Sequence, residues 1–554
     1  MSYAQKPVQC LCAALSLALL VITLAAGCAA TGPSAGSPAA PGSYQVVATG
    51  PGDVDLITPR ALAAIARADI VFCEPRQQEQ LEAFLSFDGK QVLAGYGVIF
   101  PYYGRDCATV PTDQPSRWSM SCEQFQEKQA DFVARVRAAV AAGRHVVLLS
   151  GGDPTIYGPA MWSLHALADL NPGVVPGISA FNAANAALQV RLGEVVLTAP
   201  FQRPDRKDTL ENFAGNDQAT LVIFMPREMP AMLQRLQAAY PAETPAAVVV
   251  RAGHADREKV IVGTLADIGE RLDPAEANMS LFYLGRSLNT AQYRPAKTAD
   301  ARKGRFYLLG MGPGDADLAS LRALAVIEKA DLIFARQRLQ ERFSAHLEGK
   351  QVLDGYHRLF PFYGRDCAAV TASERSRERM SCEQYQTKQA EFAAMVRAAV
   401  AEGKTVALLD SGDPMIYGPN AWTLTELADL PTEVVPGLSA LNAGNAALAT
   451  GVTEGKNSHS VILASGWTVE RMAAYQATMV LFTMRTEFKT FIDALAKHYP
   501  PHTPVAIVQS AGYAEREKVL RGRLDTILAE MDAGRLPFEY LLYVGDFLEG
   551  RSQW

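Results

Sequence analysis

The segment Gly152-Asp153-Pro154-Thr155-Ile156-Tyr157-Gly158-Pro159 returns 260 residues later, with one substitution, as Gly412-Asp413-Pro414-Met415-Ile416-Tyr417-Gly418-Pro419. The repeat extends outward from this segment in both directions. Tyr44–Asp53 matches Phe306–Asp315, and Phe100–Cys107 matches Phe360–Cys367. A period this long indicates a duplicated domain rather than the short unit of a solenoid. The sequence therefore predicts two modules, module 1 (residues 43–295) and module 2 (residues 304–554), joined near Pro295–Lys303.

Within each module, short apolar segments alternate with amphipathic ones. Continuous apolar runs are typical of strands that are buried on both faces of a sheet, and their alternation with helices predicts an α/β module with ligand loops at the carboxyl ends of the strands. A cleft is expected between the two halves of the module. The strands predicted in module 1 are Val46-Val47, Ile70–Phe72, His145–Leu149, Thr220–Met225 and Ala246–Val250.

Helix boundaries are marked by local signals. Thr58 is a suitable N-cap, and Pro59 suits the first helical position. Ser121 with Gln124 three residues later resembles a capping box for a helix that continues to about Ala142 and ends at Gly143.

The Gly-Pro-Gly-Asp turns at residues 50–53 and 312–315 follow the first strand of each module. Glycine lets the backbone approach a ligand closely, although tight turns of this kind are common without one. The turn lacks the Lys-Ser/Thr ending of a P-loop, and its aspartate is unfavourable beside a phosphate. An uncharged or cationic nucleoside suits it better.

The order of the later landmarks is more specific than any one turn. Gly151–Gly158 and Ser411–Gly418 are followed by Val174–Ala180 and Val434–Ala440, and then by Thr220–Met225, Thr244-Pro245 and Gly263–Leu265. This order resembles the S-adenosylmethionine-dependent tetrapyrrole methylases, the family of uroporphyrinogen and precorrin methyltransferases. The resemblance covers nearly all of each module. It implies two α/β subdomains per module, with S-adenosylmethionine in the cleft between them.

The resemblance also implies cofactor positions. In module 1 these are Pro51, Gly151, Gly152, Asp153, Ile156, Ser179, Ala180 and Met225, and in module 2 they are Pro313, Gly412, Asp413, Ile416, Ser439 and Ala440. Each module departs from the family pattern at some positions. Module 1 has Ala48 where the family usually has glycine and module 2 keeps Gly310, while module 2 has Ser411 opposite Gly151 and Thr483 opposite Met225, with Met484 one place on.

Methyl transfer from a sulfonium is an in-line displacement, so alignment and exclusion of water supply much of the acceleration without a dedicated nucleophile. No catalytic residue is assigned, and none of the 8 His has the spacing of a metal site such as HExxH. A polycarboxylate tetrapyrrole would need cations, and Arg105 and Arg365 are the candidates. The alternatives are an ion pair with the adjacent Asp106 or Asp366, or a solvated loop charge.

The N-terminus resembles a secretory leader. Leu11–Ala26 is an almost unbroken apolar run behind Lys6, and Leu24–Cys28 resembles the lipobox of bacterial lipoproteins. This predicts a signal peptide (1–27), followed by a lipidated Cys28 and a flexible tether (28–42). The alternative is an uncleaved anchor helix. Both place the modules outside the cytoplasmic membrane, in the periplasm or at the cell surface.

The cysteines agree with that compartment. Cys107 and Cys122 are 15 residues apart, as are Cys367 and Cys382, and in an oxidising compartment both pairs are expected to form disulfides. Buried free thiols are the alternative. Cys73 is left over, as a small core residue on a strand.

The net charge of −6 offers no excess of cations to follow a phosphate backbone, so nucleic acid is not expected as a partner. Two functions stay open at this point. One is an S-adenosylmethionine-dependent methyltransferase acting on a tetrapyrrole or related macrocycle. The other is a membrane-anchored binding or scaffold protein built on the duplicated fold, since fold does not fix function. In either case the duplication predicts that the modules pair as an internal pseudo-dimer.

Overall fold

The computed structural model describes residues 41–110, 120–200, 206–216, 218–226, 228–293, 304–483, 488–531 and 539–550. The predicted signal peptide, Cys28 and nearly all of the tether lie outside the described residues, as do the junction near residues 295–303 and Met484.

Each module begins with a parallel sheet, and the two sheets have the same strand order. In the described residues of module 1 the order is β3 (Gln91–Leu93), β2 (Ile70–Phe72), β4 (His145–Ser150), β1 (Ser43–Ala48) and β5 (Gly173–Val175). In those of module 2 it is β13 (Gln351–Leu353), β12 (Leu332–Phe334), β14 (Thr405–Asp410), β11 (Arg305–Gly310) and β15 (Thr432–Val435). The sheet forms the first half of each module.

The second halves of the modules share one larger sheet. Within the described ranges its order is β19 (Lys518–Arg523), β18 (Pro504–Gln509), β20 (Tyr540–Val544), β17 (Thr478–Phe482), β16 (Val461–Ser465), β6 (Val195–Thr198), β7 (Thr220–Phe224), β10 (Ser280–Leu284), β8 (Pro245–Val250) and β9 (Lys259–Thr264). The modules meet where β6 and β16 pair antiparallel, with Val195 opposite Leu463. This pairing removes two strand edges that would otherwise need protection.

The shared sheet has an apolar core on each face. Leu221 and Ile223 of β7 belong to one core, and Val222 and Phe224 of the same strand belong to the other. Side chains alternate between the faces of a strand, which explains this division. Both cores contain residues from both modules, so the packing is continuous across the module boundary.

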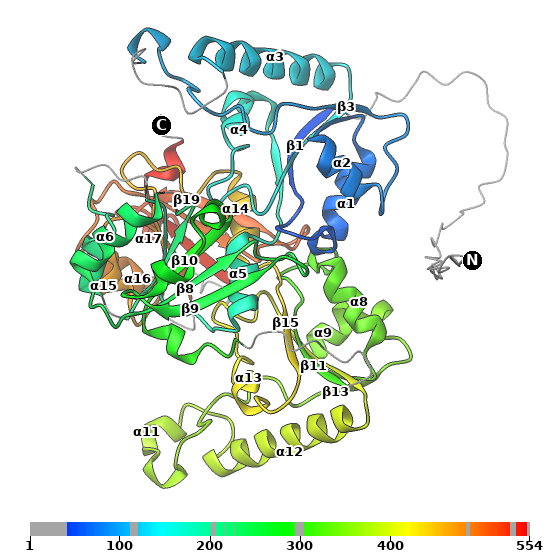
Figure 1. The fold of residues 1–554 in the computed structure, drawn as a ribbon, viewed down its shortest axis with the longest axis vertical. Coiled ribbons are helices and arrows are strands. Elements are labelled where there is room, and N and C mark those ends of the chain that lie inside the picture. Colours follow the sequence, from blue (N-terminus) through cyan, green and yellow to red (C-terminus); the bar gives the residue numbers. More distant parts are fainter. Residues whose placement is uncertain are drawn as a thin grey trace, which may run out of the picture. The chain divides into compact units, whose positions relative to one another are not determined.

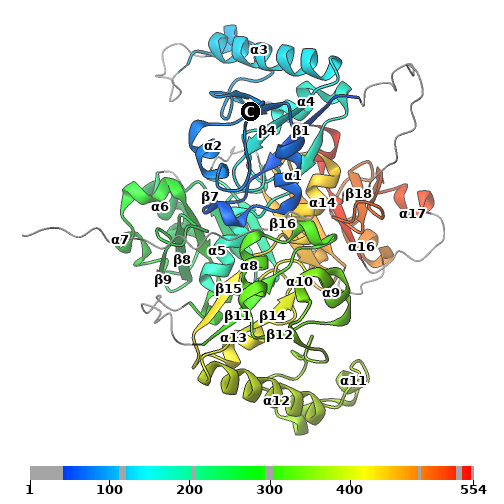
Figure 2. The ribbon, with the colours of Figure 1, turned by 90° about the vertical axis from the view of Figure 1, so that its right-hand side faces the viewer.

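Helices cover the sheets. α5 (Ala180–Leu188) and α14 (Ala440–Leu448) contribute to one core of the shared sheet, and α6 (Met229–Ala239), α15 (Val469–Ala473) and α16 (Phe488–Leu495) to the other. The long helices α3 (Cys122–Ala141) and α12 (Cys382–Ala401) lie at opposite ends of residues 41–554, whereas α1 (Pro59–Arg67) and α8 (Leu321–Lys329) lie beside each other in the middle (Figures 1 and 2). The other described helices are α2 (Pro75–Leu81), α4 (Trp162–Ala166), α7 (Ile268–Arg271), α9 (Gln337–Arg342), α10 (Ser344–Leu347), α11 (Ala372–Arg375), α13 (Trp422–Glu426) and α17 (Ile527–Glu530).

The local signals in the sequence are confirmed. The Thr58 hydroxyl caps α1 by accepting from Ala61 N at 3.2 Å, and Ser121 and Gln124 form the reciprocal capping box of α3. Caps of this kind stabilise a helix by about 1 kcal/mol each. Cys73 is a buried free thiol as expected, but it follows the end of β2 instead of lying on the strand.

Candidate functional site

A cavity of about 270 Å³ lies in module 2, between the carboxyl ends of β11 and β14 and the shared sheet. Its volume is near the lower end of the range for small-molecule sites. The cleft expected between the halves of a module is therefore present in module 2. All six positions that the sequence assigns to a cofactor in this module line it, namely Pro313, Gly412, Asp413, Ile416, Ser439 and Ala440, and Thr483 lines it too.

Two glycines allow the loops around the cavity to approach one another. A Cβ on Gly310 would lie 2.4 Å from the backbone nitrogen of Gly437, so only glycine permits this approach. Gly412 has a φ of +83°, and a Cβ there would meet nothing closer than the Leu438 carbonyl oxygen at 3.8 Å. The backbone at Gly412 therefore borders open space, where a ligand can approach it.

Aromatic side chains form much of the apolar wall. The rings of Tyr417 and Phe482 are 4.7 Å apart, and Tyr540 also lines the cavity. The hydroxyls of Tyr417 and Tyr540 are buried and have no hydrogen-bond partner among the described residues. Neither hydroxyl is turned to the cavity: the Tyr540 ring packs against Phe488 in the core on the other face of the shared sheet, and the Tyr417 hydroxyl lies near Arg191 and Glu194 of module 1.

Three arginines that the sequence analysis missed also line the cavity: Arg336, Arg338 and Arg342. Arg342 holds the first loop by donating to the Gly314 carbonyl oxygen at 2.6 Å, and burial lowers the pKa of Arg342. Arg338 pairs with Glu539 at 3.1 Å, whereas the Nε of Arg336 has no partner in the described part of the chain. The sequence did contain a signal for them: the three arginines follow β12 closely, and ligands bind at the carboxyl ends of the strands of a parallel sheet.

Two buried carboxyl groups lie at and just after the end of β14. Asp413 lines the cavity and accepts hydrogen bonds from Met415 N at 2.7 Å and from Asn182 Nδ2 at 2.5 Å. Asp410 is 1% exposed, and the amides of Ser411 and Asn420 lie near its carboxyl oxygens without meeting full hydrogen-bond geometry. Burial raises the pKa of Asp410 to about 7, and the Arg336 charge and nearby amides offset only part of the effect. Burial likewise raises the pKa of Asp413 to about 7.

The assigned positions of module 1 are also drawn together. Ile156, Ala180 and Met225 pack against the same apolar core. Pro51 and Ser179 are buried, Ser179 as the N-cap of α5, whereas Gly151 is exposed and Gly152 partly so, its N–H donating to the Gly50 carbonyl at 2.8 Å.

Asp153 is more fully hydrogen-bonded than Asp413. Its Oδ1 accepts from both the backbone N–H and the hydroxyl of Thr155, at 2.9 and 2.6 Å, and its Oδ2 accepts from Asn442 Nδ2 at 2.6 Å. Burial raises the pKa of Asp153 to about 6. Met415, which replaces Thr155 in module 2, has no hydroxyl to offer Asp413.

The loops that carry Asp153 and Asp413 also contact the opposite module. Each of these contacts has a counterpart in which the roles of the two modules are exchanged. Asn182 of module 1 reaches Asp413 of module 2, and Asn442 reaches Asp153. The aspartates of the Gly-Pro-Gly-Asp turns are bound by arginines of the opposite module, and therefore face the module boundary. The pairs are Arg60 with Asp315 (3.0 Å) and Asp317 (2.7 Å), and Arg322 with Asp53 (3.0 Å) and Asp55 (2.7 Å).

Neither Arg105 nor Arg365 lines this cavity, and their role in binding a substrate stays a prediction. Both are exposed. Arg365 pairs with Glu374 at 2.6 Å, and the adjacent Asp366 accepts from the Ala368 backbone instead of pairing with the arginine. A disulfide ties this loop to the start of α12, at the end of the module.

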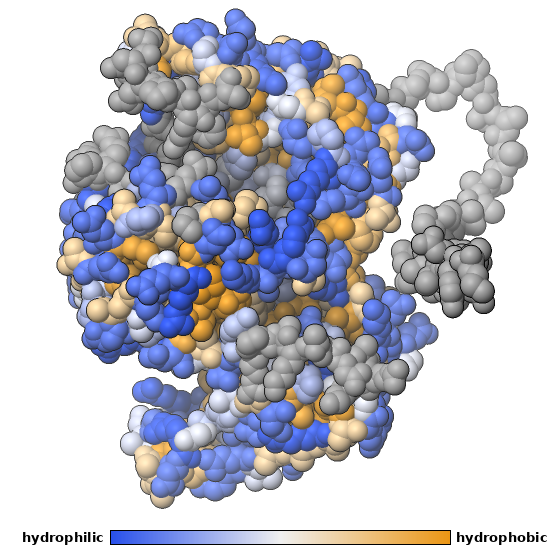
Figure 3. Space-filling view, in the orientation of Figure 1, coloured by the Kyte–Doolittle hydropathy of each residue, from blue (hydrophilic) through white to orange (hydrophobic). Residues whose placement is uncertain are grey.

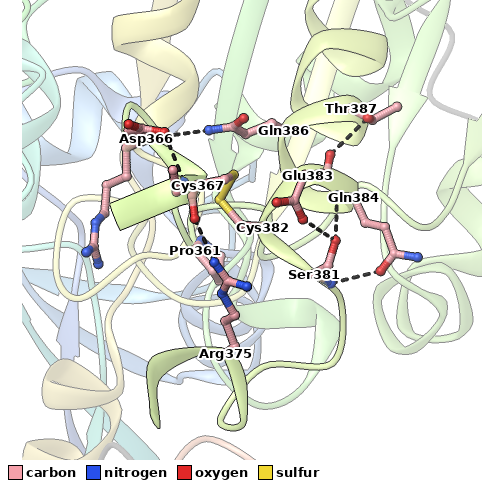
Figure 4. The surroundings of a disulfide bond; sticks show 12 residues. Pro361, Asp366, Cys367, Arg375, Ser381, Cys382, Glu383, Gln384, Gln386 and Thr387 are labelled. Atoms are coloured by element: carbon pink, nitrogen blue, oxygen red, sulfur yellow. Dashed lines mark hydrogen bonds between the residues drawn. A yellow bond between two sulfur atoms is a disulfide. The ribbon is translucent and has the colours of Figure 1, made fainter. Parts of the chain in front are cut away.

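Both predicted disulfides are present, Cys107–Cys122 and Cys367–Cys382. Figure 4 shows that the second bridge joins the turn at Cys367 to the first residue of α12, where Ser381 caps the helix and Arg375 donates to the Cys367 carbonyl oxygen at 2.9 Å. The two bridges therefore have a structural role in fixing matching loops.

Among the residues that the structure describes, no helix has the length and apolarity that a membrane span requires. The face drawn in Figure 3 is mostly hydrophilic, and its apolar residues form separate patches.

A family model for tetrapyrrole (corrin/porphyrin) methylases matches the chain twice, over residues 45–269 and 305–528. Siroheme synthase of Hahella chejuensis is 28% identical over 316 residues, which are 54% of this chain and 60% of that protein. Cobalt-precorrin-4 C(11)-methyltransferase of Methanocaldococcus jannaschii is 29% identical over 268 residues, 46% of this chain and 92% of that protein. The chain spans between half and 60% of the length of the first siroheme synthases that it matches.

Two solved structures are also similar. A cobalt precorrin-4 methyltransferase has 22% identity and a TM-score of 0.36, covering 44% of this chain and 95% of that one. A uroporphyrin-III C-methyltransferase from Thermus thermophilus, complexed with S-adenyl homocysteine, has 22% identity and a TM-score of 0.33, covering 44% of this chain and 99% of that one.

Proposed function

The chain belongs to the tetrapyrrole (corrin/porphyrin) methylase family in both of its modules, and on this premise we propose that it is an S-adenosylmethionine-dependent methyltransferase acting on a tetrapyrrole or related macrocycle. The observation that carries the proposal is the cavity of module 2, which all six assigned cofactor positions of that module line.

The residues present fit an adenosyl sulfonium compound. Such a ligand combines a flat apolar ring with hydroxyl and amino groups and a positive sulfur. The cavity offers aromatic surfaces at Tyr417 and Phe482, the buried carboxyl group of Asp413 and open backbone at Gly412. An aromatic face attracts a nearby cation by about 0.5–2 kcal/mol, more strongly where water is excluded.

When bound, S-adenosylmethionine would supply an electrophilic methyl group on sulfur. The residues of the chain have the task of holding the donor and the acceptor in line and of keeping water out. Asp413, the Gly412 backbone and the aromatic wall would hold the donor. Arg336 and Arg338 lie on the same cavity and would bind carboxylate groups of the acceptor, the role that the sequence analysis gives to Arg105 and Arg365.

Methyl transfer tests this proposal directly. The full-length chain, in mild detergent, is incubated with radiolabelled S-adenosylmethionine and a uroporphyrinogen-type tetrapyrrole, and the label in the tetrapyrrole is measured. We expect transfer by the parent protein and a strong loss in Ala440→Phe, which fills the cavity. The control is Phe84→Ala, at an exposed site in module 1, which should keep full activity. If the parent protein neither binds S-adenosylmethionine nor transfers its methyl group, the proposal is wrong.

We further propose that the protein is an extracytoplasmic lipoprotein anchored through Cys28. The two disulfides support an oxidising compartment, because such bridges are rare in the cytosol. Mass spectrometry of the membrane fraction tests this: a soluble chain with an unmodified Cys28 would contradict it.

The modules are proposed to act as an internal pseudo-dimer. The pairing of β6 with β16 and the matching contacts of Asn182 and Asn442 support this proposal, since reciprocal contacts are typical of two-fold interfaces.

A further inference from the structure

The two modules differ most where module 2 has its cavity. Arg336, two residues after β12, lines the cavity and its Nε has no partner among the described residues, whereas the matching residue after β2 is Glu74, whose Oε1 already accepts from Gly95 N at 3.1 Å and Gly97 N at 3.2 Å. Polar groups that are already paired inside the protein have less to gain from a ligand than unpaired ones. This difference favours module 2 as a ligand site.

The tyrosines of the second loops differ in the same way. Tyr157 of module 1 donates its hydroxyl to the His459 carbonyl oxygen at 2.6 Å. His459 lies in a segment that exists only in module 2, where eight residues (453–460) stand in place of two (193–194). Module 1 has no equivalent carbonyl to offer Tyr417, whose hydroxyl lies near Arg191 and Glu194 of module 1 and has no hydrogen-bond partner among the described residues. The two modules are thus fastened less tightly at Tyr417 than at Tyr157.

The aspartates of the second loops follow the same pattern. Thr155 gives Asp153 two hydrogen bonds, and Met415 gives Asp413 one. Asp413 is 3% exposed and lines the cavity, so its carboxyl group can accept a further hydrogen bond from a ligand bound there. A buried carboxylate gains strongly from a further donor.

Residues of module 1 nevertheless support the cavity of module 2, because they bond to one of the loops that line it. Asn182 holds the Oδ2 of Asp413 at 2.5 Å. Leu192 bridges the same loop from both sides, with its N–H donating to the Met415 carbonyl at 2.8 Å and its carbonyl accepting from Tyr417 N at 3.2 Å. The loop that carries Asp413 and Tyr417 is thus fastened to the other module.

From these contacts we infer that module 2 holds the single working cofactor site of the chain, and that module 1 serves as its built-in partner, with Asn182 as a positioning residue for Asp413. The inference rests on the proposed function, and it states which module binds the cofactor and which module supports that site.

Calorimetric titration of the full-length chain with S-adenosylhomocysteine tests it, because the duplication provides a matched control. Asn182→Asp and Asn442→Asp each remove the amide donor to the aspartate of the opposite module, but keep the side-chain oxygen that accepts from Ser179 or Ser439 and caps α5 or α14. We expect one equivalent bound per chain, a loss of affinity of at least about ten-fold in Asn182→Asp, as for one hydrogen bond to a charged group, and unchanged affinity in Asn442→Asp.

A second readout separates positioning from a general loss of structure. Asn182 favours the ionised form of Asp413, which also faces Met415 N, the Asp410 carboxyl group and the Tyr283 hydroxyl. Loss of this donor should move the pH midpoint of binding upward in Asn182→Asp but not in Asn442→Asp. Phe482→Leu, which removes an aromatic ring from the cavity wall and no polar group, should weaken binding without altering the midpoint.

Two bound equivalents, or equal losses in both asparagine variants, would overturn the inference while leaving the methyltransferase proposal intact. If the parent protein binds none, the proposed function and the inference fail together.

Discussion

Replacing Asp410 by Asn should stabilise the protein above neutral pH and have little effect in acid. Asp410 is buried at the end of β14 with only weak contacts from the amides of Ser411 and Asn420, and burial raises its pKa from 3.8 to about 7. An acid whose pKa is raised on folding holds its proton more tightly in the folded state. It therefore costs stability progressively as the pH rises from its unfolded pKa to its folded pKa.

The size of the effect follows from the shift. A difference of about three pKa units corresponds to at most about 4 kcal/mol at about 1.4 kcal/mol per unit. The gain from Asp410→Asn should be near zero at pH 4, grow between pH 4 and pH 7, and stay constant above that. Module 1 carries Ser150 at the matching position, so a neutral polar side chain is accepted by the same local fold.

Urea denaturation of the parent protein, Asp410→Asn and Asp410→Ser at pH 4.5 and pH 8 measures this difference. Asp153 also has a raised pKa, but it is common to all three proteins and cancels in the comparison. The Asp410 charge helps to raise the pKa of Asp413, so its removal also relieves Asp413 and adds to the gain at pH 8. A gain that is the same at both pH values, or a loss of stability at pH 8, would refute the reasoning, because the cost would then not arise from ionisation of Asp410.

Three further outcomes are expected. Replacing Cys367 and Cys382 together by Ser should lower the free energy of unfolding by about 3 kcal/mol, the value for a loop of this length, in denaturation without reductant; an unchanged midpoint would show that the loop is held without the bridge. Gly310→Ala should cost about 2 kcal/mol and weaken S-adenosylhomocysteine binding, because its Cβ would meet the Gly437 backbone; full affinity would mean that the loops can separate freely. Arg60→Ala, which frees the first loop of module 2, should weaken binding in calorimetry at unchanged stoichiometry, and equal affinity to the parent would contradict a role for that contact.

Much of the fold is determined locally, and the sequence therefore reveals it. The duplication is visible as repeated landmarks, and the caps at Thr58 and Ser121 depend on residues three positions apart. The disulfides depend on a spacing of 15 residues in each module. The six cofactor positions of module 2 came from the resemblance to the methylase family, and they line one cavity because the loops that carry them meet at the same edge of the parallel sheet.

The pairing of β6 with β16, the hold of Asn182 on Asp413 and the position of Arg336 on the cavity were decided by the tertiary structure alone. Asn182 and Asp413 are 231 residues apart, and no periodicity or spacing links them. Their contact depends on how two folded modules dock, which in turn depends on shape and apolar packing summed over both.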